Sequence, residues 1–306
     1  MCCLSSKDTI DSLPQNTSCT AIAWFSTGDT DQKDIDALTT NRTRVYIYKD
    51  RIYRYYAEHL NNKNFDNFVD DICKIIDDKR ADVFIFGNMY LPYDPYGGDS
   101  SGYDDNMQRR IYDLFKSLQT KKPNTLYGLM LRTSPDPGFN LGYLQEVVSC
   151  FVYPACNLVP CLYHSEESHM ASQDPADKVE QYVKAIVSHV NSNKVYLIIQ
   201  IGADSSRAIQ DPVKTDSYTT FCSVKPSKYR RFCIDDLLNF YKKGKLVWTY
   251  KLAGAFLHSY DYDDYHCDCG CGCYAATTAI TAGLKGSPEP ELTKCTNWTL
   301  RYKDRH

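Results

Sequence analysis

The chain has 306 residues, enough for one large barrel or two modest domains with a sizeable core. Its formal net charge of -3 and its lack of a long basic run argue against a nucleic-acid partner. It has no run of about 18 apolar residues, so the sequence predicts no membrane span.

The 14 cysteines are a dense, even-numbered set, which is ordinary for an oxidised extracellular protein and unusual for a cytosolic one. Three N-x-S/T sequons, at Asn16, Asn41 and Asn297, are candidate glycosylation sites and favour the same compartment. No apolar h-region follows Met1, so the sequence shows no signal peptide. We therefore expect a secreted protein whose signal peptide is not visible in this chain.

Residues 1–43 form a polar, cysteine-containing lead-in with one strand-like run, Thr20–Phe25, which is a candidate for completing the sheet. From Arg44 onward, strand-like and helix-like segments alternate. In chain order the pattern predicts strand Val45–Tyr48, helix Phe65–Asp78, strand Asp82–Phe86, helix Asp105–Leu118, strand Leu126–Leu131, helix Leu141–Ser149, strand Asn157–Tyr163, helix Pro175–Val190, strand Val195–Ile201, strand Tyr218–Val224, helix Ile234–Tyr241 and strand Leu252–His258.

This alternation predicts an α/β fold in which helices cover a parallel sheet. About eight strand candidates favour a closed (β/α)8 TIM-type barrel over an open sheet. We divide the chain into a cysteine-containing N-terminal extension at residues 1–43, a (β/α) barrel at 44–285 and a C-terminal tail at 286–306.

The last predicted strand opens the segment Leu252–Cys267, which reads L-A-G-A-F-L-H-S-Y-D-Y-D-D-Y-H-C. Its short apolar run is typical of a buried parallel strand. Acids and tyrosines follow at once, from Tyr260 to Tyr265. Polar and aromatic side chains just past a strand suit the ligand-binding mouth of a barrel, so we expect this cluster to lie there.

This segment resembles the last barrel strand of the family 18 glycoside hydrolases, the chitinases and chitinase-like lectins, which typically reads G-G-A-M-x-W-A-x-D-x-D-D-F. The tryptophan that floors the family's sugar site corresponds to His258 here. Val45–Tyr48 is similar to the family's first strand, Ala81–Met89 to its second, and Leu118–Arg132 to its L-K-x-K-N-P-x-L-K-x-L-L-x-I-G-G-W.

Asp177–Ile201 resembles the family's fourth helix and fifth strand. The resemblance covers residues 44–267 and implies a disulfide-rich (β/α)8 barrel. The span between Ile201 and Leu252 is short for the family's sixth and seventh strands with their usual insertions. We therefore expect the barrel to be trimmed or irregular between residues 202 and 251.

Active members of the family carry D-G-x-D-x-D-x-E on the fourth strand, where the glutamate protonates the glycosidic oxygen and an aspartate positions the substrate's N-acetyl group. In the segment that resembles it, Cys156–Glu167, the acids correspond to Pro160, Leu162 and His164. A shift of two residues places Glu166 at the acid position but still leaves no assisting aspartate. The resemblance thus predicts a catalytically inactive chitinase-like protein, with no catalytic residue unless Glu166 serves.

The resemblance also implies that the barrel mouth binds a glycan of the N-acetylglucosamine type or a protein partner. The 25 tyrosines suit stacking on sugars, although each could equally serve ordinary packing. His258, facing inward, could contact a ligand or be a satisfied core histidine. The candidate cleft residues are Tyr48, Tyr90, Arg132, Tyr163, His164, Gln200, His258 and Tyr260.

The segment Cys267–Cys273 places four thiols at alternate residues. They could form a thiolate cluster for zinc or copper, but their spacing is not the usual C-x₂-C of structural zinc sites. We favour disulfides to distant partners, because alternate residues of a strand point along one face. The candidates, whose connectivity the sequence does not give, are Cys150, Cys156, Cys161, Cys222, Cys233, Cys267, Cys269, Cys271, Cys273 and Cys295.

Two other acid-containing segments deserve a metal hypothesis. His164 and His169 flank Glu166 and Glu167, but a strand-end loop does not place them on one helical face and a third ligand is not evident. The acids in residues 99–105 lack the EF-hand spacing. We expect no metal and no cofactor.

Three functions remain open. The first is a catalytically inactive chitinase-like secreted protein that binds a glycan or a protein at the barrel mouth. The second is an active glycoside hydrolase with a relocated acid, such as Glu166 or Asp261. The third is a purely protein-binding secreted effector, which would fail to bind in a glycan array.

Overall fold

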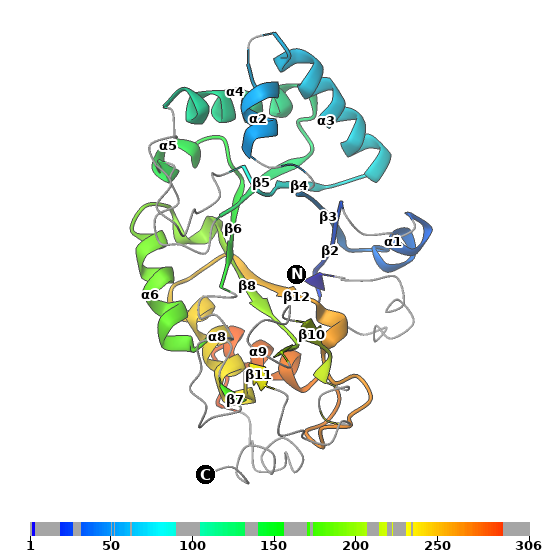
Figure 1. Cartoon of the computed structure of the whole chain (residues 1–306), viewed down its shortest axis with the longest axis vertical. Helices are drawn as coiled ribbons and strands as arrows, with labels where there is room; N and C mark the ends of the chain where they lie inside the picture. Colours follow the sequence, from blue (N-terminus) through cyan, green and yellow to red (C-terminus); the bar gives the residue numbers. More distant parts are fainter. Residues whose placement is uncertain are drawn as a thin grey trace.

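The computed structural model describes residues 2–3, 19–26, 32–49, 51, 53–61, 63–89, 105–131, 140–155, 170–171, 174–206, 214–218, 222, 231–233 and 235–289. Within these ranges, eight parallel strands close a barrel in the order β1-β12-β8-β6-β5-β4-β3-β2, and Figure 1 shows them as a ring. The strands are β1 (Cys2–Cys3), β2 (Ala21–Phe25), β3 (Thr43–Tyr48), β4 (Val83–Phe86), β5 (Leu126–Met130), β6 (Cys150–Pro154), β8 (Val195–Gln200) and β12 (Gly254–His258).

Helices surround the ring of strands on its outside (Figure 1). They are α1 (Gln32–Leu38), α2 (Tyr53–His59), α3 (Phe65–Lys79), α4 (Asp105–Lys121), α5 (Leu141–Leu144), α6 (Ala176–Val187), α8 (Leu237–Thr249) and α9 (Ala275–Leu284), with short 3-10 turns η4 (Ser192–Lys194) and η5 (Tyr260–Tyr262). In the part of the chain that the structure describes, no helix has both the length and the apolar character that a bilayer crossing requires.

The strands have two apolar faces, because successive side chains of a strand point to opposite sides. On β3, Val45 and Ile47 face the barrel interior, whereas Tyr46 and Tyr48 face the helices. The interior cluster consists mostly of small and β-branched side chains, namely Ala21, Ala23, Val45, Ile47, Val83, Ile85, Cys150, Val152, Ile198 and Phe256. A closed parallel sheet with both faces buried requires this pattern, so the barrel interior is a packed core.

The predicted α/β barrel is confirmed, and most predicted elements coincide with observed ones within a few residues. The strand in the lead-in, Ala21–Phe25, pairs with β3, and β1 joins β2 to β12 to close the ring. Residues of the 1–43 segment therefore belong to the barrel sheet. Val45–Tyr48 lies in β3, which is the third of the eight barrel strands along the chain and not the first, as the resemblance implied. The division of the chain at residues 43 and 285 stays a prediction.

Four predicted elements differ from the structure. Helix α8 (Leu237–Thr249) continues eight residues past the predicted end at Tyr241. Strand Asn157–Tyr163 lies outside the described residues, and the observed strand β6 ends just before it. Helix α5 ends at Leu144, because Val147 and Val148 are buried in the following turn and only mimic a helical repeat. Tyr218 has helical conformation instead of beginning a strand. Its ring is fully buried, which explains its strand-like sequence signal.

The expected irregularity between residues 202 and 251 holds three strands of a second, small sheet, whose fourth strand comes from the segment before β8. Its strand order is β10-β9-β11-β7, and β9 pairs in antiparallel fashion with both neighbours. The strands are β7 (Met170–Ala171), β9 (Ala203–Ser206), β10 (Lys214–Asp216) and β11 (Arg231–Cys233). The chain then returns through α8 to the last barrel strand, β12.

Helices α8 and α9 approach closely at two glycines. A Cβ atom added at Gly244 would lie 2.3 Å from the carbonyl oxygen of Ile280, and one added at Gly283 would lie 2.3 Å from that of Tyr241. Beside this contact, the buried ammonium of Lys243 pairs with Asp235 at 2.5 Å, both side chains being 1% exposed. The pairing offsets the free-energy cost of burying a charged group in the core.

We expect Gly244→Ala to destabilise the fold by about 1–3 kcal/mol, because the new methyl group meets backbone that must shift to admit it. Denaturant unfolding measures the loss. Lys245→Ala, at an exposed position of the same helix, is the matched control and should change stability by about 0.5 kcal/mol or less. Equal stability of the two variants would contradict the close glycine contact.

Candidate functional site at the barrel mouth

The carboxyl ends of the parallel strands meet at one end of the barrel, where (β/α) barrels place their ligand sites. Phe25 ends β2, Gln200 ends β8, His258 ends β12, and Lys49 directly follows β3. Each of them continues the inward-facing alternation of its strand. We call Phe25, Lys49, Gln200 and His258 the mouth cluster.

Lys49 is the charged member of the mouth cluster. Its Nζ lies 3.8 Å from the centroid of the Phe25 ring, a cation–π contact. Its stem crosses Gly87, where an added Cβ would lie only 2.8 Å from Lys49 Cβ. The backbone N–H of Lys49 donates to Ser26 Oγ at 3.2 Å, and its carbonyl accepts from Asn88 Nδ2 at 2.9 Å. These contacts fix the position from which the ammonium reaches the mouth.

His258 is half-buried opposite Phe25, with the two ring centroids 5.4 Å apart in an edge-to-face arrangement. Strand pairing places it beside Gln200. Its Nδ1 lies 3.4 Å from Ser259 Oγ. Burial, and to a lesser extent the positive charge of Lys49, lower the pKa of His258 from 6.5 to about 4. The imidazole is therefore neutral at physiological pH and can donate one hydrogen bond and accept another.

Carboxylates are missing from the described inward positions at the mouth. These positions hold the four members of the mouth cluster together with Gly87 and Pro154. The fourth of the eight barrel strands along the chain is β4, and its inward residues Val83 and Ile85 carry no acid either. Within the described part of the chain, the mouth is thus aromatic, amidic and cationic.

Two of the acids that follow β12, Asp263 and Asp264, bind backbone N–H groups. Asp263 is fully buried, and burial raises its pKa. Its carboxylate accepts hydrogen bonds from the backbone N–H groups of Ala276 at 3.2 Å and Thr277 at 2.8 Å. Because these groups open helix α9, Asp263 supplies the acceptors that the first turn of a helix lacks. The expectation that this acidic cluster lies at the ligand mouth is wrong for Asp263.

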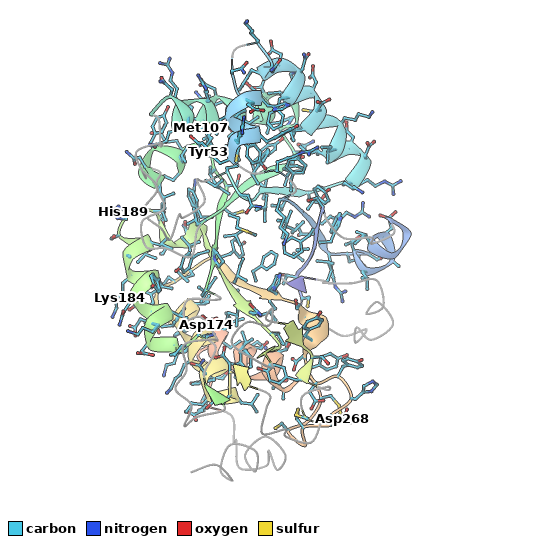
Figure 2. All side chains as sticks on the ribbon, in the orientation of Figure 1. Tyr53, Met107, Asp174, Lys184, His189 and Asp268 are labelled. Atoms are coloured by element: carbon cyan, nitrogen blue, oxygen red, sulfur yellow. A yellow bond between two sulfur atoms is a disulfide. The ribbon has the colours of Figure 1, made fainter. Side chains whose placement is uncertain are left out.

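Asp264, also fully buried, organises the cysteine loop in the same way. Its two carboxylate oxygens accept from the backbone N–H groups of Asp268 and Cys269, each at 2.8 Å. Figure 2 shows Asp268 at the edge of the molecule, away from the barrel axis. Asp264 therefore has a structural role too.

Two disulfides of the cysteine loop have both partners among the described residues, one of the expected kind and one that corrects the prediction. Cys269 pairs with the distant Cys222, as expected, but Cys267 pairs with Cys273 inside the loop. The segment is not a strand: Cys267, Gly270 and Gly272 have φ angles of 63°, 71° and 85°, which curl it into a tight turn. Its thiols therefore do not share one face.

The remaining cysteines divide into bonded and free. Cys271 and Cys19 are disulfide-bonded. Cys150 is free and buried, so its candidacy for a disulfide is wrong: it faces the barrel interior opposite Gly128, where an added Cβ would lie 2.7 Å from its sulfur. Among the described residues, no three His, Cys, Asp or Glu side chains are grouped so that they could hold a metal ion. Cys156, Cys161 and Cys295 lie outside the described residues, as does the side chain of Cys233.

The structure brings together two of the eight predicted cleft residues, Gln200 and His258. Tyr48 instead packs on the helix-facing side of the sheet, near Phe84 and Phe86. It points to this side because it directly follows the inward Ile47 on the strand. Tyr260 is buried and stacks on Tyr274, with ring centroids 5.7 Å apart. Outside the described residues lie Tyr90, Arg132, Tyr163 and His164, together with Glu166, Asn16 and Asn297.

Sequence reasoning missed Phe25 and Lys49. Phe25 was available as the last residue of a predicted strand, and Lys49 lies two positions beyond the inward Ile47. Counting by twos along each strand would have selected Lys49 and rejected Tyr48. Whether a residue occupies an inward or an outward position of its strand predicted its place better than whether its side chain is aromatic or polar.

A groove of about 600 Å³ lies elsewhere, between α6 and α8 on the outer helical layer. Acidic and basic side chains line it together, among them Asp177, Glu180, Asp236, Lys242 and Lys245. Glu180 is already engaged by Tyr250 Oη at 2.6 Å and Lys184 Nζ at 3.0 Å. We take the barrel mouth, and not this groove, as the candidate site, because the fold places ligands at the strand ends.

No protein-family model and no curated protein sequence matches this chain. Catalytic domain 2 of the group II chitinase of Ostrinia furnacalis has a TM-score of 0.69 and 15% identity, covering 94% of this chain and 97% of that one. A chitinase of Chromobacterium violaceum has a TM-score of 0.69 and 13% identity, with 93% and 98% covered. YKL-39, solved in the presence of chitooligosaccharides, has a TM-score of 0.66 and 13% identity, with 92% and 98% covered.

The chain is thus a (β/α) barrel protein with its polar site at the strand ends. More narrowly, its fold is that of the family 18 chitinases and chitinase-like proteins, as the last-strand resemblance implied. At these identities the likeness defines the fold and leaves the activity to be argued from the site.

His258 should make stability depend on pH. Its folded pKa lies below its unfolded value, so the unfolded state binds more protons between pH 6.5 and about 4. The stability from the neutral imidazole is complete above pH 6.5 and is lost as pH falls toward 4. We expect the difference in unfolding free energy between the native chain and His258→Gln to shrink over this window. His189→Gln, on an exposed residue beyond α6 (Figure 2), should show no such change.

Asp263→Ala should lower the free energy of unfolding by about 1–3 kcal/mol, because it orphans buried N–H groups at the start of α9. Asp263→Asn, which keeps an acceptor oxygen, should recover part of the loss, and Asp78→Ala on the exposed face of α3 serves as the control. Thermal melting gives the comparison. An unchanged melting temperature for Asp263→Ala would contradict the capping role.

Proposed function

We propose that this chain is a secreted chitinase-like protein that binds glycans of the N-acetylglucosamine type at the barrel mouth and does not hydrolyse them. The observation that carries the proposal is the chemistry of the described mouth: an aromatic ring, an ammonium, an amide and a neutral imidazole, with no carboxylate. The chitinase fold, and a neighbour solved with chitooligosaccharides, support a sugar ligand.

Each part of the mouth cluster has a plausible task in sugar binding. The Phe25 ring offers an apolar surface for a sugar ring. The Gln200 amide and the His258 imidazole offer donors and acceptors for hydroxyl and acetamido groups. Hydrolysis would also require a general acid and a carboxylate that orients the N-acetyl group. Tyr90, Arg132, Tyr163 and His164 stay predicted contributors to this cleft.

Secretion is supported by the disulfides Cys222–Cys269 and Cys267–Cys273, because such bonds persist in oxidising compartments. The candidate glycosylation residue Asn41 agrees with it: it is exposed in the turn between α1 and β3. A protein partner at the same mouth is the alternative that glycan-binding measurements distinguish.

Titration calorimetry with chitotetraose should detect binding, and Phe25→Ala should weaken it about two- to tenfold through loss of the stacking surface. Tyr143→Ala, an exposed tyrosine on α5, is the matched control and should bind normally. Chromatography of the same mixtures should show no cleavage of the tetramer. Cleavage that disappears in Glu166→Gln would overturn the non-hydrolytic part of the proposal and establish a relocated acid.

Expression through a eukaryotic secretory pathway should add an N-linked glycan at Asn41, because its side chain is exposed and the sequon Asn41-Arg42-Thr43 is intact. Peptide mass spectrometry before and after enzymatic deglycosylation locates the modified residue. Asn41→Gln should lose that glycan and remain folded. A fully secreted protein with unmodified Asn41 would contradict this assignment.

A further inference from the structure

The mouth cluster carries a net positive charge that no described acid offsets. Phe25 and Gln200 are uncharged, and His258 is neutral at physiological pH. Lys49 contributes one positive charge at a half-buried position. The chain as a whole has a net charge of -3, so a general excess of basic residues does not explain this local sign.

Lys49 differs in this respect from other lysines of the fold. Lys121 pairs with Asp70, Lys122 with Asp77, and the buried Lys243 with Asp235. In the described part of the chain no carboxylate forms an ion pair with Lys49, whose ammonium contacts the face of Phe25. A ring face satisfies an ammonium only partly, because it leaves N–H donors directed elsewhere.

The backbone from which the ammonium extends is also held in place. Gly87 makes room for its stem, and the hydrogen bonds with Ser26 and Asn88 fix its backbone. A preorganised cation beside an aromatic ring and a neutral imidazole can bind an anionic group without first breaking an internal ion pair. In a partly desolvated site, such a charge-assisted hydrogen bond is stronger than a neutral one.

We propose that the barrel mouth selects acidic glycans, that is, N-acetylated oligosaccharides that carry carboxylate or sulfate groups, with Lys49 as the counter-ion. This inference rests on the proposed glycan-binding function and names the substrate class of the same site. Phe25 would contact the sugar ring while Lys49, beside it, binds the anionic substituent. A neutral chitin oligomer would use the ring but leave the charge uncompensated.

The test compares two tetrasaccharides that both contain N-acetylglucosamine: chitotetraose, which is neutral, and a hyaluronan tetrasaccharide, in which uronic acids alternate with it. Calorimetry at low ionic strength should show about tenfold tighter binding of the acidic probe, the gain from one charge-assisted contact. Added salt should reduce this preference. A sulfated chitotetraose, which carries sulfate but no carboxylate, distinguishes sulfate from carboxylate as the preferred anion.

Lys49→Met should abolish the preference for the acidic probe, whereas Lys49→Arg, which keeps the charge, should retain it. Lys63→Met removes an exposed lysine between α2 and α3 and should change nothing. Thermal melting establishes that each variant is folded, and the arginine variant tests the charge even where the methionine variant is unstable.

The outcomes separate the two proposals. Equal or tighter binding of chitotetraose by the native chain, or an acidic preference that survives Lys49→Met, would overturn the inference and leave glycan binding standing. Binding of neither tetrasaccharide would overturn both the inference and the proposed function.

Discussion

The period of two along a parallel strand is the constraint on which this site depends. In a closed barrel each strand sends alternate side chains into the interior and the others toward the helices. The same rule that buries Val45 and Ile47 inside the barrel brings Lys49 to its mouth and sends Tyr48 outward. Whether a polar side chain lies at the mouth therefore depends on its position along the strand as much as on the type of residue.

The acidic segment after β12 shows how a family-like sequence can serve the backbone and not a ligand. Asp263 accepts from the N–H groups that open α9, and Asp264 accepts from those of the cysteine loop. Both carboxylates are buried and occupied by these hydrogen bonds. The two acids of the segment that most resembles a chitinase thus support the scaffold, while His258 of the same segment reaches the barrel mouth.

The barrel could be predicted from the sequence, because long periodic segments such as Phe65–Lys79 and Val195–Gln200 carry strong local signals. The small sheet could not, since its strands are two to four residues long and depend on tertiary pairing. The site was predicted in part: Gln200 and His258 were found, Phe25 and Lys49 were missed. The pairing Cys267–Cys273 depends on positive φ angles that the residue spacing does not reveal.

Gly87 has a consequence for how such a mouth can change over evolution. Any side chain there would collide with the stem of Lys49 and displace it from Phe25. A substitution at this position would therefore move the ammonium at the opening while leaving Lys49 itself unchanged. The glycine thus influences the mouth through the space that it leaves for the Lys49 side chain.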